Sequence, residues 1–390
     1  MTLAGKTVLV TGGTGFVGGR LVEKLVLEQQ ARVRVLVRNF STASRIARFP
    51  IEMVGGDVAD TAVVQKAVQG CEVVFNCAHE GSLKKEQQKA LTLQSAQNLG
   101  EASLQAGVSR FVHVSTFAVY GPTLDGNLTE LSPWQPSDHS YIQAKRAAET
   151  LMLDWQQQKG LPVVVLQPTI VYGPFCKPWT LKPITDLKTG LVPLVNGGHG
   201  YCNGVYIDDV VEAMILAATQ PDILGETFLI SGPEPVSWKI FYNAFETALG
   251  IQATIDITDG ELKLLEGRQM SGKSLKARLL RLARSRRVTK RVNKVPPLRG
   301  SLKILEKYLS ADQAPLPAYP GQNGSGGHRE DKQPGMPVHI PNETLLALYR
   351  SQTWVRIDKA QKLLGYTPKF DFERGMDLTT QFIQWANLRA

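Results

Sequence analysis

Tyr141 and Lys145 are the residues most suited to chemistry. Three residues separate them, so on a helix both side chains lie on one face. A tyrosine near its ordinary pKa of about 10 is a poor base at neutral pH. A neighbouring ammonium group stabilises the phenolate and lowers that pKa toward the range of efficient general acid–base catalysis. The pair predicts a site where Tyr141 moves a proton, assisted by Lys145, which can also bond a cofactor ribose.

Two hydroxyl side chains, Ser115 and Thr116, precede this pair at the end of a strand predicted over 110–116. The C-terminal ends of parallel strands open on the ligand crevice of such sheets. Either hydroxyl could donate a hydrogen bond to a carbonyl or alkoxide oxygen of a substrate. The alternative, in which a hydroxyl caps local backbone groups, stays open for one of the two.

A glycine-rich turn, Thr11-Gly12-Gly13-Thr14-Gly15-Phe16-Val17-Gly18, follows an apolar run over 6–10 and opens an apolar-periodic helix over 16–27. Gly12 permits a tight turn, Gly15 lets backbone N–H groups approach a pyrophosphate, and Gly18 lets helix and strand pack closely. The helix N-terminus then faces the anion with free N–H groups and its positive dipole end. The pattern predicts a dinucleotide site, and a glycine loop without a ligand is the alternative.

Arg38 bears on which dinucleotide is bound. NAD sites usually place an acidic residue at the end of the second strand, where it accepts bonds from the ribose 2′-hydroxyl. Here that strand, predicted over 31–37, is followed by Arg38 and Asn39, with no acid. Arg38 can pair with a 2′-phosphate. The sequence therefore favours NADP over NAD, unless Arg38 is merely exposed at a strand end.

Strands and helices alternate strictly over the first 175 residues, which predicts an α/β fold: a Rossmann-type doubly wound parallel sheet covered by helices on both faces. We expect a dinucleotide-binding domain over 1–173 plus about 205–230, and a smaller C-terminal substrate domain over 174–204 and 231–390. Strands are predicted over 6–10, 31–37, 51–54, 73–78, 110–116, 163–167 and 226–230, and helices over 16–27, 87–106, 141–159, 238–249 and 359–366.

The net charge of +9 on 390 residues comes from one segment, because 268–305 holds 13 Lys or Arg and no acidic residue. We expect a basic helical insertion over about 262–310, with leucines at helical spacing, and a Pro/Gly-rich mobile loop over 312–342. Residues 268–309 could contact an anionic membrane surface, cover the site as a lid, or form a solvated elaboration or a homodimer contact. Aromatic residues are not interleaved there, which disfavours nucleic acid.

The four cysteines lack metal-ligand spacing, so we expect no metal site and reduced thiols in a cytoplasmic protein. No apolar run reaches 18 residues, and membrane association would be peripheral. The strand pattern begins at Lys6, which leaves no room for an N-terminal signal.

Taken together, the motifs resemble the extended short-chain dehydrogenase/reductase family. Within that family they are similar to the NAD-dependent epimerase/dehydratase branch and also have 3β-hydroxysteroid dehydrogenase-like features. The resemblance covers about 5–250 and 352–386. It is carried by the glycine turn, Gly56-Asp57-Val58, the segment from Val112 to Gly121, Tyr141-x-x-x-Lys145, Pro168-x-x-x-Tyr172-Gly173-Pro174, Val205-Tyr206-Ile207-Asp208-Asp209-Val210 and Leu363-Leu364-Gly365-Tyr366-x-Pro368.

The resemblance implies a role for each matching position. Tyr141 would be the general acid/base, Lys145 its partner, and Thr116 the third member, with Ser115 in reserve. Asp57 and Val58 would border the adenine, Asn76 to Ala78 would run beside the cofactor, and Pro168 would pass near the nicotinamide. The predicted cofactor contacts are Gly12, Thr14, Gly15, Phe16, Val17, Gly18, Arg38, Asp57, Val58, Cys77, Ala78, Tyr141, Lys145 and Pro168.

Two departures from the family pattern bear on the substrate. Thr92 stands where the family often has an asparagine, which puts a proton-relay role there in doubt. Residues 201–204 lack the arginine with which many nucleotide-sugar members grip a diphosphate. We expect hydride transfer at a secondary alcohol or ketone carbon, most simply by an epimerase/dehydratase-like enzyme on a nucleotide sugar. The alternatives are an NADP-dependent dehydrogenase/reductase of a lipophilic hydroxy or keto compound, of 3β-hydroxysteroid type, and a non-catalytic cofactor-binding scaffold.

Overall fold

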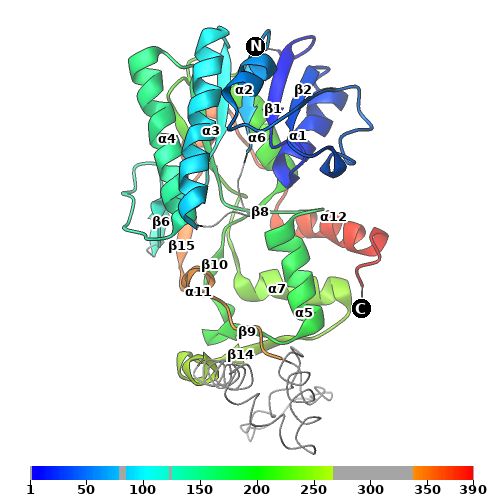
Figure 1. Cartoon of the computed structure of the whole chain (residues 1–390). Helices are drawn as coiled ribbons and strands as arrows, with labels where there is room; N and C mark the ends of the chain where they lie inside the picture. The colour runs from blue at the N-terminus through cyan, green and yellow to red at the C-terminus, as the bar shows by residue number, and fades with distance from the viewer. Residues whose placement is uncertain (1, 79–84, 123–124, 267–336, 390) are drawn as a thin grey trace, which may run out of the picture. The chain divides into compact units, whose positions relative to one another are not determined.

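The computed structural model describes residues 2–78, 85–122, 125–266 and 337–389, and its central feature is a parallel sheet (Figure 1). The sheet has seven strands in the order β12-β7-β5-β4-β1-β2-β3, every neighbouring pair being parallel. The order reverses at β1, which opens a crevice at the C-terminal ends of β1 and β4. The strands are β1 (Thr7–Thr11), β2 (Arg32–Val37), β3 (Glu52–Gly55), β4 (Val73–Asn76), β5 (Arg110–Val114), β7 (Val163–Pro168) and β12 (Thr227–Ile230).

Helices cover both faces of this sheet, as the alternating pattern predicts. On one face α1 (Phe16–Leu27) packs against α6 (Ile207–Thr219), and on the other α3 (Lys85–Gln105) lies between α2 (Thr61–Val68) and α4 (Ser140–Lys159) (Figure 1). The second face encloses a buried apolar core that includes Val74, Phe111 and Trp155. A fully buried parallel sheet needs such β-branched and aromatic strands. The predicted fold class is confirmed.

Several predicted elements differ from the observed ones in detail. The strand predicted over 110–116 ends at Val114, so Ser115 and Thr116 lie beyond it. Helix α2 was not predicted from the sequence. The helix predicted over 359–366 is observed over 358–364, with π geometry over η6 (Ala360–Leu364), and it ends at the predicted cap Gly365 in the left-handed conformation, φ 70°. A left-handed glycine closes the turn there because it has no Cβ to clash.

The chain divides into two compact units. The larger comprises the described residues within 1–184, 199–250 and 347–390, and the smaller those within 185–198 and 251–346. These limits do not coincide with the boundaries expected at 174, 204 and 231, because the C-terminal segment and α7 (Trp238–Leu249) pack in the larger unit. Trp238 lies 4.7 Å from Tyr349 between ring centroids, and β15 (Thr353–Val355) pairs with β6 (Gly126–Leu128). The functional division into cofactor and substrate domains stays a prediction.

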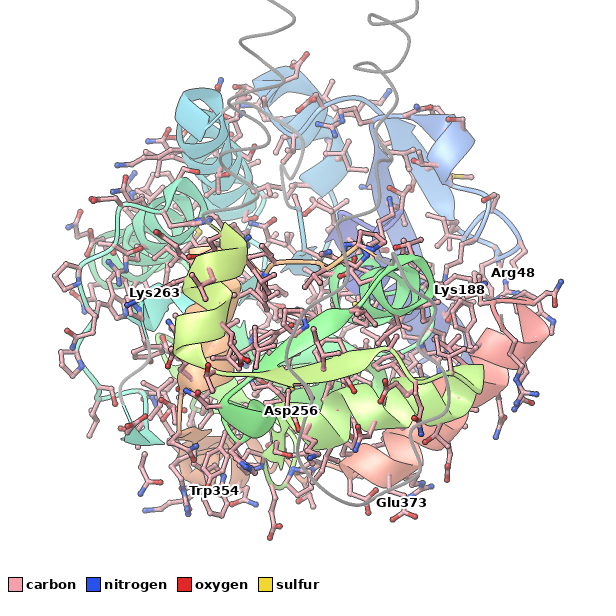
Figure 2. All side chains as sticks on the ribbon, turned by 90° about the horizontal axis from the view of Figure 1, so that it is seen from below. Arg48, Lys188, Asp256, Lys263, Trp354 and Glu373 are labelled. Atoms are coloured by element: carbon pink, nitrogen blue, oxygen red, sulfur yellow. The ribbon has the colours of Figure 1, made fainter. Side chains whose placement is uncertain are left out.

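The larger unit contains further helices and strands besides the sheet and the helices that cover it. Ser237 caps α7 as predicted, its Oγ accepting a hydrogen bond from the Ile240 N–H at 3.2 Å. Exposed charged side chains such as Arg48 and Glu373 lie on the surface of this unit (Figure 2).

The other elements of the larger unit are η1 (Phe40–Thr42), η2 (Phe117–Tyr120), β8 (Ile170–Tyr172), η3 (Lys177–Leu181), β10 (Tyr201–Cys202), β11 (Gly204–Tyr206), β13 (Val236–Ser237) and α12 (Phe372–Trp385). Two further helices, α5 (Lys182–Thr189) and α11 (Glu343–Arg350), contain residues of both units.

The smaller unit is built on a parallel pair, β9 (Val192–Val195) and β14 (Thr254–Ile257). Val195, Ile257, Leu262 and Leu346 form its apolar core. Lys188, Asp256 and Lys263 of this unit are exposed (Figure 2). The basic segment 268–309 and most of the loop predicted over 312–342 lie outside the described residues. Contact of that segment with a membrane stays a prediction, and the described helices include none long and apolar enough to cross a bilayer.

Asp209 ties α6 to the C-terminal segment. Its carboxylate is 1% exposed and accepts hydrogen bonds from the backbone N–H groups of Lys369 (2.8 Å) and Phe370 (3.1 Å). Burial raises the pKa of Asp209 to about 6, and the two backbone N–H groups oppose that rise. Asp209 therefore anchors the chain that leads into α12.

Replacing Asp209 by alanine is expected to lower the free energy of unfolding by about 2–3 kcal/mol, because two buried N–H groups lose their acceptor. Urea denaturation measures this change. Glu212→Ala is the matched control on the same helix, since Glu212 pairs with the largely exposed Lys369 at 3.4 Å. It is expected to change stability by less than about 1 kcal/mol. Equal losses in the two variants would contradict the anchoring role of Asp209.

Candidate active site

The glycine turn joins β1 to α1 in the crevice of the sheet. Gly12 has φ 68°, and a Cβ placed on it would lie 2.5 Å from the carbonyl oxygen of Cys77. A Cβ on Gly18 would lie 2.4 Å from the carbonyl oxygen of Gly12. Gly15 precedes α1, and no side chain caps the helix there. The turn thus brings the uncapped N–H groups of α1 to the crevice, in the arrangement that binds a pyrophosphate.

Asn76 connects the ends of the three strands beside this turn. Its Oδ1 accepts from Thr11 Oγ1 at 3.0 Å and from the Ala78 N–H at 3.3 Å, and its Nδ2 lies 3.2 Å from Nδ1 of His113. Cys77 and Ala78 therefore follow β4 directly along the glycine turn. Both lie beside the glycine turn, and their contact with a cofactor stays a prediction.

Arg38 and Asp57 meet at the ends of β2 and β3. Arg38 Nη1 lies 3.6 Å from Asp57 Oδ2, and the two side chains are 58% and 42% exposed. Val58, which follows Asp57, is buried, and its carbonyl accepts from Asn98 Nδ2 at 3.2 Å. The sequence argument for NADP assumed that no acid stands near Arg38, and that assumption was wrong, because the pairing of β2 with β3 brings Asp57 to it.

Thr116, Tyr141 and Lys145 come together beyond the end of β5. Burial raises the pKa of Tyr141, and the smaller effect of a hydrogen bond with the Thr116 side chain opposes that rise. The net lowering of this pKa that the sequence predicted was therefore wrong. Lys145 is 6% exposed, and its Nζ donates to the carbonyl oxygen of Val114 at 2.9 Å. Burial lowers the pKa of Lys145 to about 8. Thr116 Oγ1 also accepts from the Ala118 N–H at 3.2 Å.

The Ser115 hydroxyl, by contrast, is hydrogen-bonded to Glu149. Its Oγ donates to Glu149 Oε2 at 2.5 Å, and the same carboxylate accepts from Gln167 Nε2 at 2.7 Å. Glu149 is 2% exposed and was not singled out from the sequence. The sequence did offer one signal for Glu149: it stands eight residues after Tyr141, which puts both side chains on the same face of the helix. Pro168 ends β7 next to Gln167.

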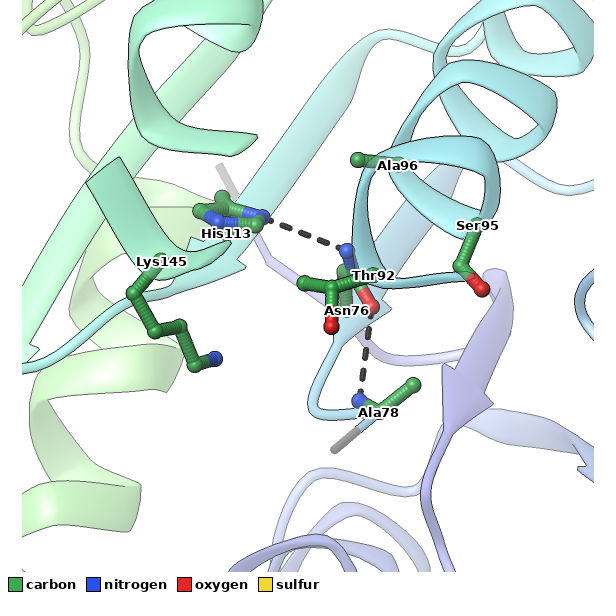
Figure 3. Close-up of a pocket in the computed structure, with 7 residues that line it drawn as sticks. All are labelled: Asn76, Ala78, Thr92, Ser95, Ala96, His113 and Lys145. Atoms are coloured by element: carbon green, nitrogen blue, oxygen red, sulfur yellow. Dashed lines mark hydrogen bonds between the residues drawn. The ribbon is translucent and has the colours of Figure 1, made fainter. Parts of the chain in front are cut away.

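A small pocket lies beside Lys145 (Figure 3). His113 Nε2 and Ser95 Oγ are buried there without a hydrogen-bond partner among the described residues. Burial and the Lys145 charge lower the pKa of His113 to about 3, so its ring is neutral. Thr92 lines this pocket, at the position where the family often has asparagine. The lining residues are Asn76, Ala78, Thr92, Ser95, Ala96, His113 and Lys145.

Metal binding finds no support in the part of the chain that the structure describes, where no group of three or more His, Cys, Asp or Glu side chains could hold an ion. Burial raises the pKa of Cys77 to about 12 and also raises that of Cys71. The thiols of Cys71, Cys77, Cys176 and Cys202 are free.

Proteins of known sequence similar to this chain include a putative dihydroflavonol 4-reductase of Synechocystis (36% identity over 221 residues; 53% of this chain, 62% of the relative). A 3β-hydroxysteroid-dehydrogenase/decarboxylase of Arabidopsis thaliana is 28% identical (63% of this chain, 61% of the relative), and a dTDP-glucose 4,6-dehydratase of Streptomyces niveus is 30% identical (54% and 68%). The match thus spans just over six-tenths of the length of the first two relatives.

Solved structures match nearly the whole chain. A UDP-glucose 4-epimerase of Thermotoga maritima with UDP-glucose has a TM-score of 0.64 at 20% identity and covers 98% of this chain and 99% of its own. A dTDP-glucose 4,6-dehydratase of Streptomyces venezuelae with NAD bound has a TM-score of 0.66 at 19% identity, covering 97% of both. At these identities the likeness shows the fold.

Residues 8–231 match the model of the NAD dependent epimerase/dehydratase family, which is more than half of the chain. Both the glycine turn and the Thr116, Tyr141 and Lys145 cluster fall inside this match. The chain belongs to the NAD dependent epimerase/dehydratase family.

Proposed function

We propose that this chain is an enzyme that binds NAD(P) and catalyses hydride transfer at a secondary alcohol or ketone carbon of a nucleotide sugar, as an epimerase or dehydratase. The observation that carries the proposal is the meeting of Thr116, Tyr141 and Lys145 beyond β5, next to the glycine turn. A nucleotide-sugar substrate is supported by the names of related proteins, among them a UDP-glucose 4-epimerase of Vibrio cholerae, 27% identical over 242 residues.

The residues around the turn fit a dinucleotide. Gly12 and Gly18 leave room that a Cβ would fill, and the uncapped start of α1 offers N–H groups to a pyrophosphate. When bound, NAD(P) supplies the acceptor and donor of the hydride. Tyr141 takes the proton from the substrate hydroxyl or returns it, while Thr116 Oγ1 holds the substrate oxygen. Lys145, mostly protonated below pH about 8, stabilises the phenolate.

Two measurements test the proposal. The purified protein is denatured and any released dinucleotide is identified by mass. UDP-glucose and dTDP-glucose are then offered with NAD⁺, and products are separated by liquid chromatography and weighed. An epimer keeps the substrate mass and a dehydration product loses one water. Failure to bind NAD(P) would contradict the cofactor site, and binding without turnover of any tested sugar would contradict the substrate class.

A second candidate is a dehydrogenase/reductase of a lipophilic hydroxy or keto compound. The similarity to relatives named as a dihydroflavonol 4-reductase and a 3β-hydroxysteroid-dehydrogenase/decarboxylase supports it, as does the absence of an arginine in 201–204. Consumption of NADPH with a dihydroflavonol, or formation of NAD(P)H with a 3β-hydroxysteroid, would favour this candidate over the nucleotide-sugar enzyme.

Cofactor preference depends on Arg38, and we expect NADP to bind better than NAD because the Arg38 guanidinium can pair with a 2′-phosphate in spite of the neighbouring Asp57. Arg38→Ala removes the cation that would meet a 2′-phosphate and is expected to weaken NADP binding about 10- to 100-fold while leaving NAD binding nearly unchanged. Asp57→Asn is the matched control, and it is expected to strengthen NADP binding by removing a nearby negative charge. Calorimetric titration of both dinucleotides measures these changes. Wild-type protein that binds NAD more tightly than NADP would overturn the expected preference.

A further inference from the structure

Glu149 is a buried carboxylate that the proposed chemistry does not use. It lies on α4 one turn after Lys145 and two turns after Tyr141, so the three side chains share one face of the helix. Ser115 Oγ donates to one carboxylate oxygen and Gln167 Nε2 to the other. Burying a carboxylate is costly unless it is paired and hydrogen-bonded, so a group in this place calls for an explanation.

The two donors belong to segments that flank the proposed site. Ser115 directly precedes Thr116 after β5, and Gln167 directly precedes Pro168 at the end of β7. Gln167 Oε1 in turn accepts from the hydroxyl of Tyr120 at 2.9 Å. Glu149 therefore ties α4 to the ends of two neighbouring strands, and a shift of its carboxylate would move Thr116 relative to Tyr141.

Few charged or titratable groups surround Glu149. Lys145 precedes it on α4 and Tyr120 approaches from η2, with Glu130 acting on Tyr120 from beyond β6. Burial raises the pKa of Glu149 to about 7, against the effects of Ser115, Gln167 and Lys145. The pKa of Lys145 is lowered by burial, while the charges of Cys77 and Glu149 raise it. Because Cys77 stays a neutral thiol until about pH 12, Glu149 is the counter-charge that operates near neutrality.

Resting on the proposed function, we propose that Glu149 is a positioning residue that keeps Lys145 protonated and, through Ser115, holds Thr116 in place beside Tyr141. The ammonium of Lys145 is lost as pH rises through about 8. Without the Glu149 charge, that loss occurs at lower pH. Activity that depends on the ammonium then falls earlier as pH rises.

Glu149→Gln tests the charge, and Ser115→Ala tests the hydrogen bond alone. In the glutamine variant the alkaline limb of the kcat profile is expected to move down by about one pH unit, with KM nearly unchanged. Ser115→Ala is expected to lower kcat with a much smaller displacement of that limb, because the carboxylate remains. The proposal would be overturned if the alkaline limb lay at the same pH in the wild type and in Glu149→Gln. It would also be overturned if that limb moved by the same amount in Glu149→Gln and Ser115→Ala.

A direct titration of Lys145 separates this proposal from the proposed function. Wild type and Glu149→Gln are treated with formaldehyde and cyanoborohydride across pH 6–10, and methylation of the peptide that contains Lys145 is measured by mass spectrometry. Labelling of the variant is expected to begin about one pH unit lower. The result stands even if no tested sugar is turned over. Unchanged labelling would overturn the role of Glu149 by itself, as would failure of Glu149→Gln to fold at pH 6, where the native carboxyl is already mostly neutral.

Discussion

Replacing Tyr141 by phenylalanine is expected to lower kcat about 10²- to 10⁴-fold, the usual contribution of a positioned acid–base group. The ring fills the same space, and the hydroxyl removed is bonded to Thr116. Binding of NAD(P) is expected to change little, because the glycine turn and Lys145 stay in place. Steady-state kinetics on the substrate identified in the sugar assay, together with dinucleotide titration, measures both quantities.

Tyr242→Phe is the matched control for this prediction. The Tyr242 hydroxyl is buried and lies 2.5 Å from that of Tyr349, away from Thr116 and Lys145. Its loss is expected to lower stability by about 1 kcal/mol and leave kcat within a factor of two or so. Turnover by Tyr141→Phe within tenfold of the wild type would remove the basis for assigning the proton transfer to Tyr141. A similar loss in both variants would point to a general effect of removing buried hydroxyls.

The order of strands and helices could be predicted from the sequence because the central strands, such as Val73–Asn76 and Val163–Pro168, are short, buried runs of mostly apolar residues. Periodicity also placed Tyr141 and Lys145 on one helix face. Helix α2 escaped prediction because its eight residues, Thr61–Val68, include three valines and no long apolar stripe. The helix expected over 359–366 ends two residues earlier than predicted, and its π geometry could not be predicted from apolar spacing in so short a segment.

The motifs could not predict contacts between side chains that lie far apart in the sequence. Arg38 and Asp57 are 19 positions apart, and only the pairing of Val37 with Gly55 brings the ends of β2 and β3 together. Glu149 meets Ser115 across 34 positions and Gln167 across 18. Ser115 and Thr116 both follow the end of a strand, so the sequence offers two candidates for substrate contact. In the structure the Ser115 hydroxyl is bonded to the Glu149 carboxylate on the next helix, whereas Thr116 lies beside Tyr141.

Gly12→Ala is expected to damage both the fold and the cofactor site. At φ 68° any Cβ is strained, and here it would also lie 2.5 Å from the carbonyl oxygen of Cys77. Strain costs about 1 kcal/mol, and forcing away the backbone that follows β4 adds about 1–3 kcal/mol. Because the displaced segment runs beside the proposed cofactor, NAD(P) affinity is expected to fall about 100-fold or more, which corresponds to about 2.7 kcal/mol.

Gly5→Ala separates the clash from the backbone strain. Gly5 has φ 71°, almost the same as Gly12, but a Cβ there has no heavy atom within 4 Å. Its replacement is expected to cost only the strain of about 1 kcal/mol and to leave dinucleotide binding unchanged. Urea denaturation and dinucleotide titration of both variants give the comparison. If Gly12→Ala lost no more stability and affinity than Gly5→Ala, the close approach of Cys77 to the turn would not be the reason that this position requires glycine.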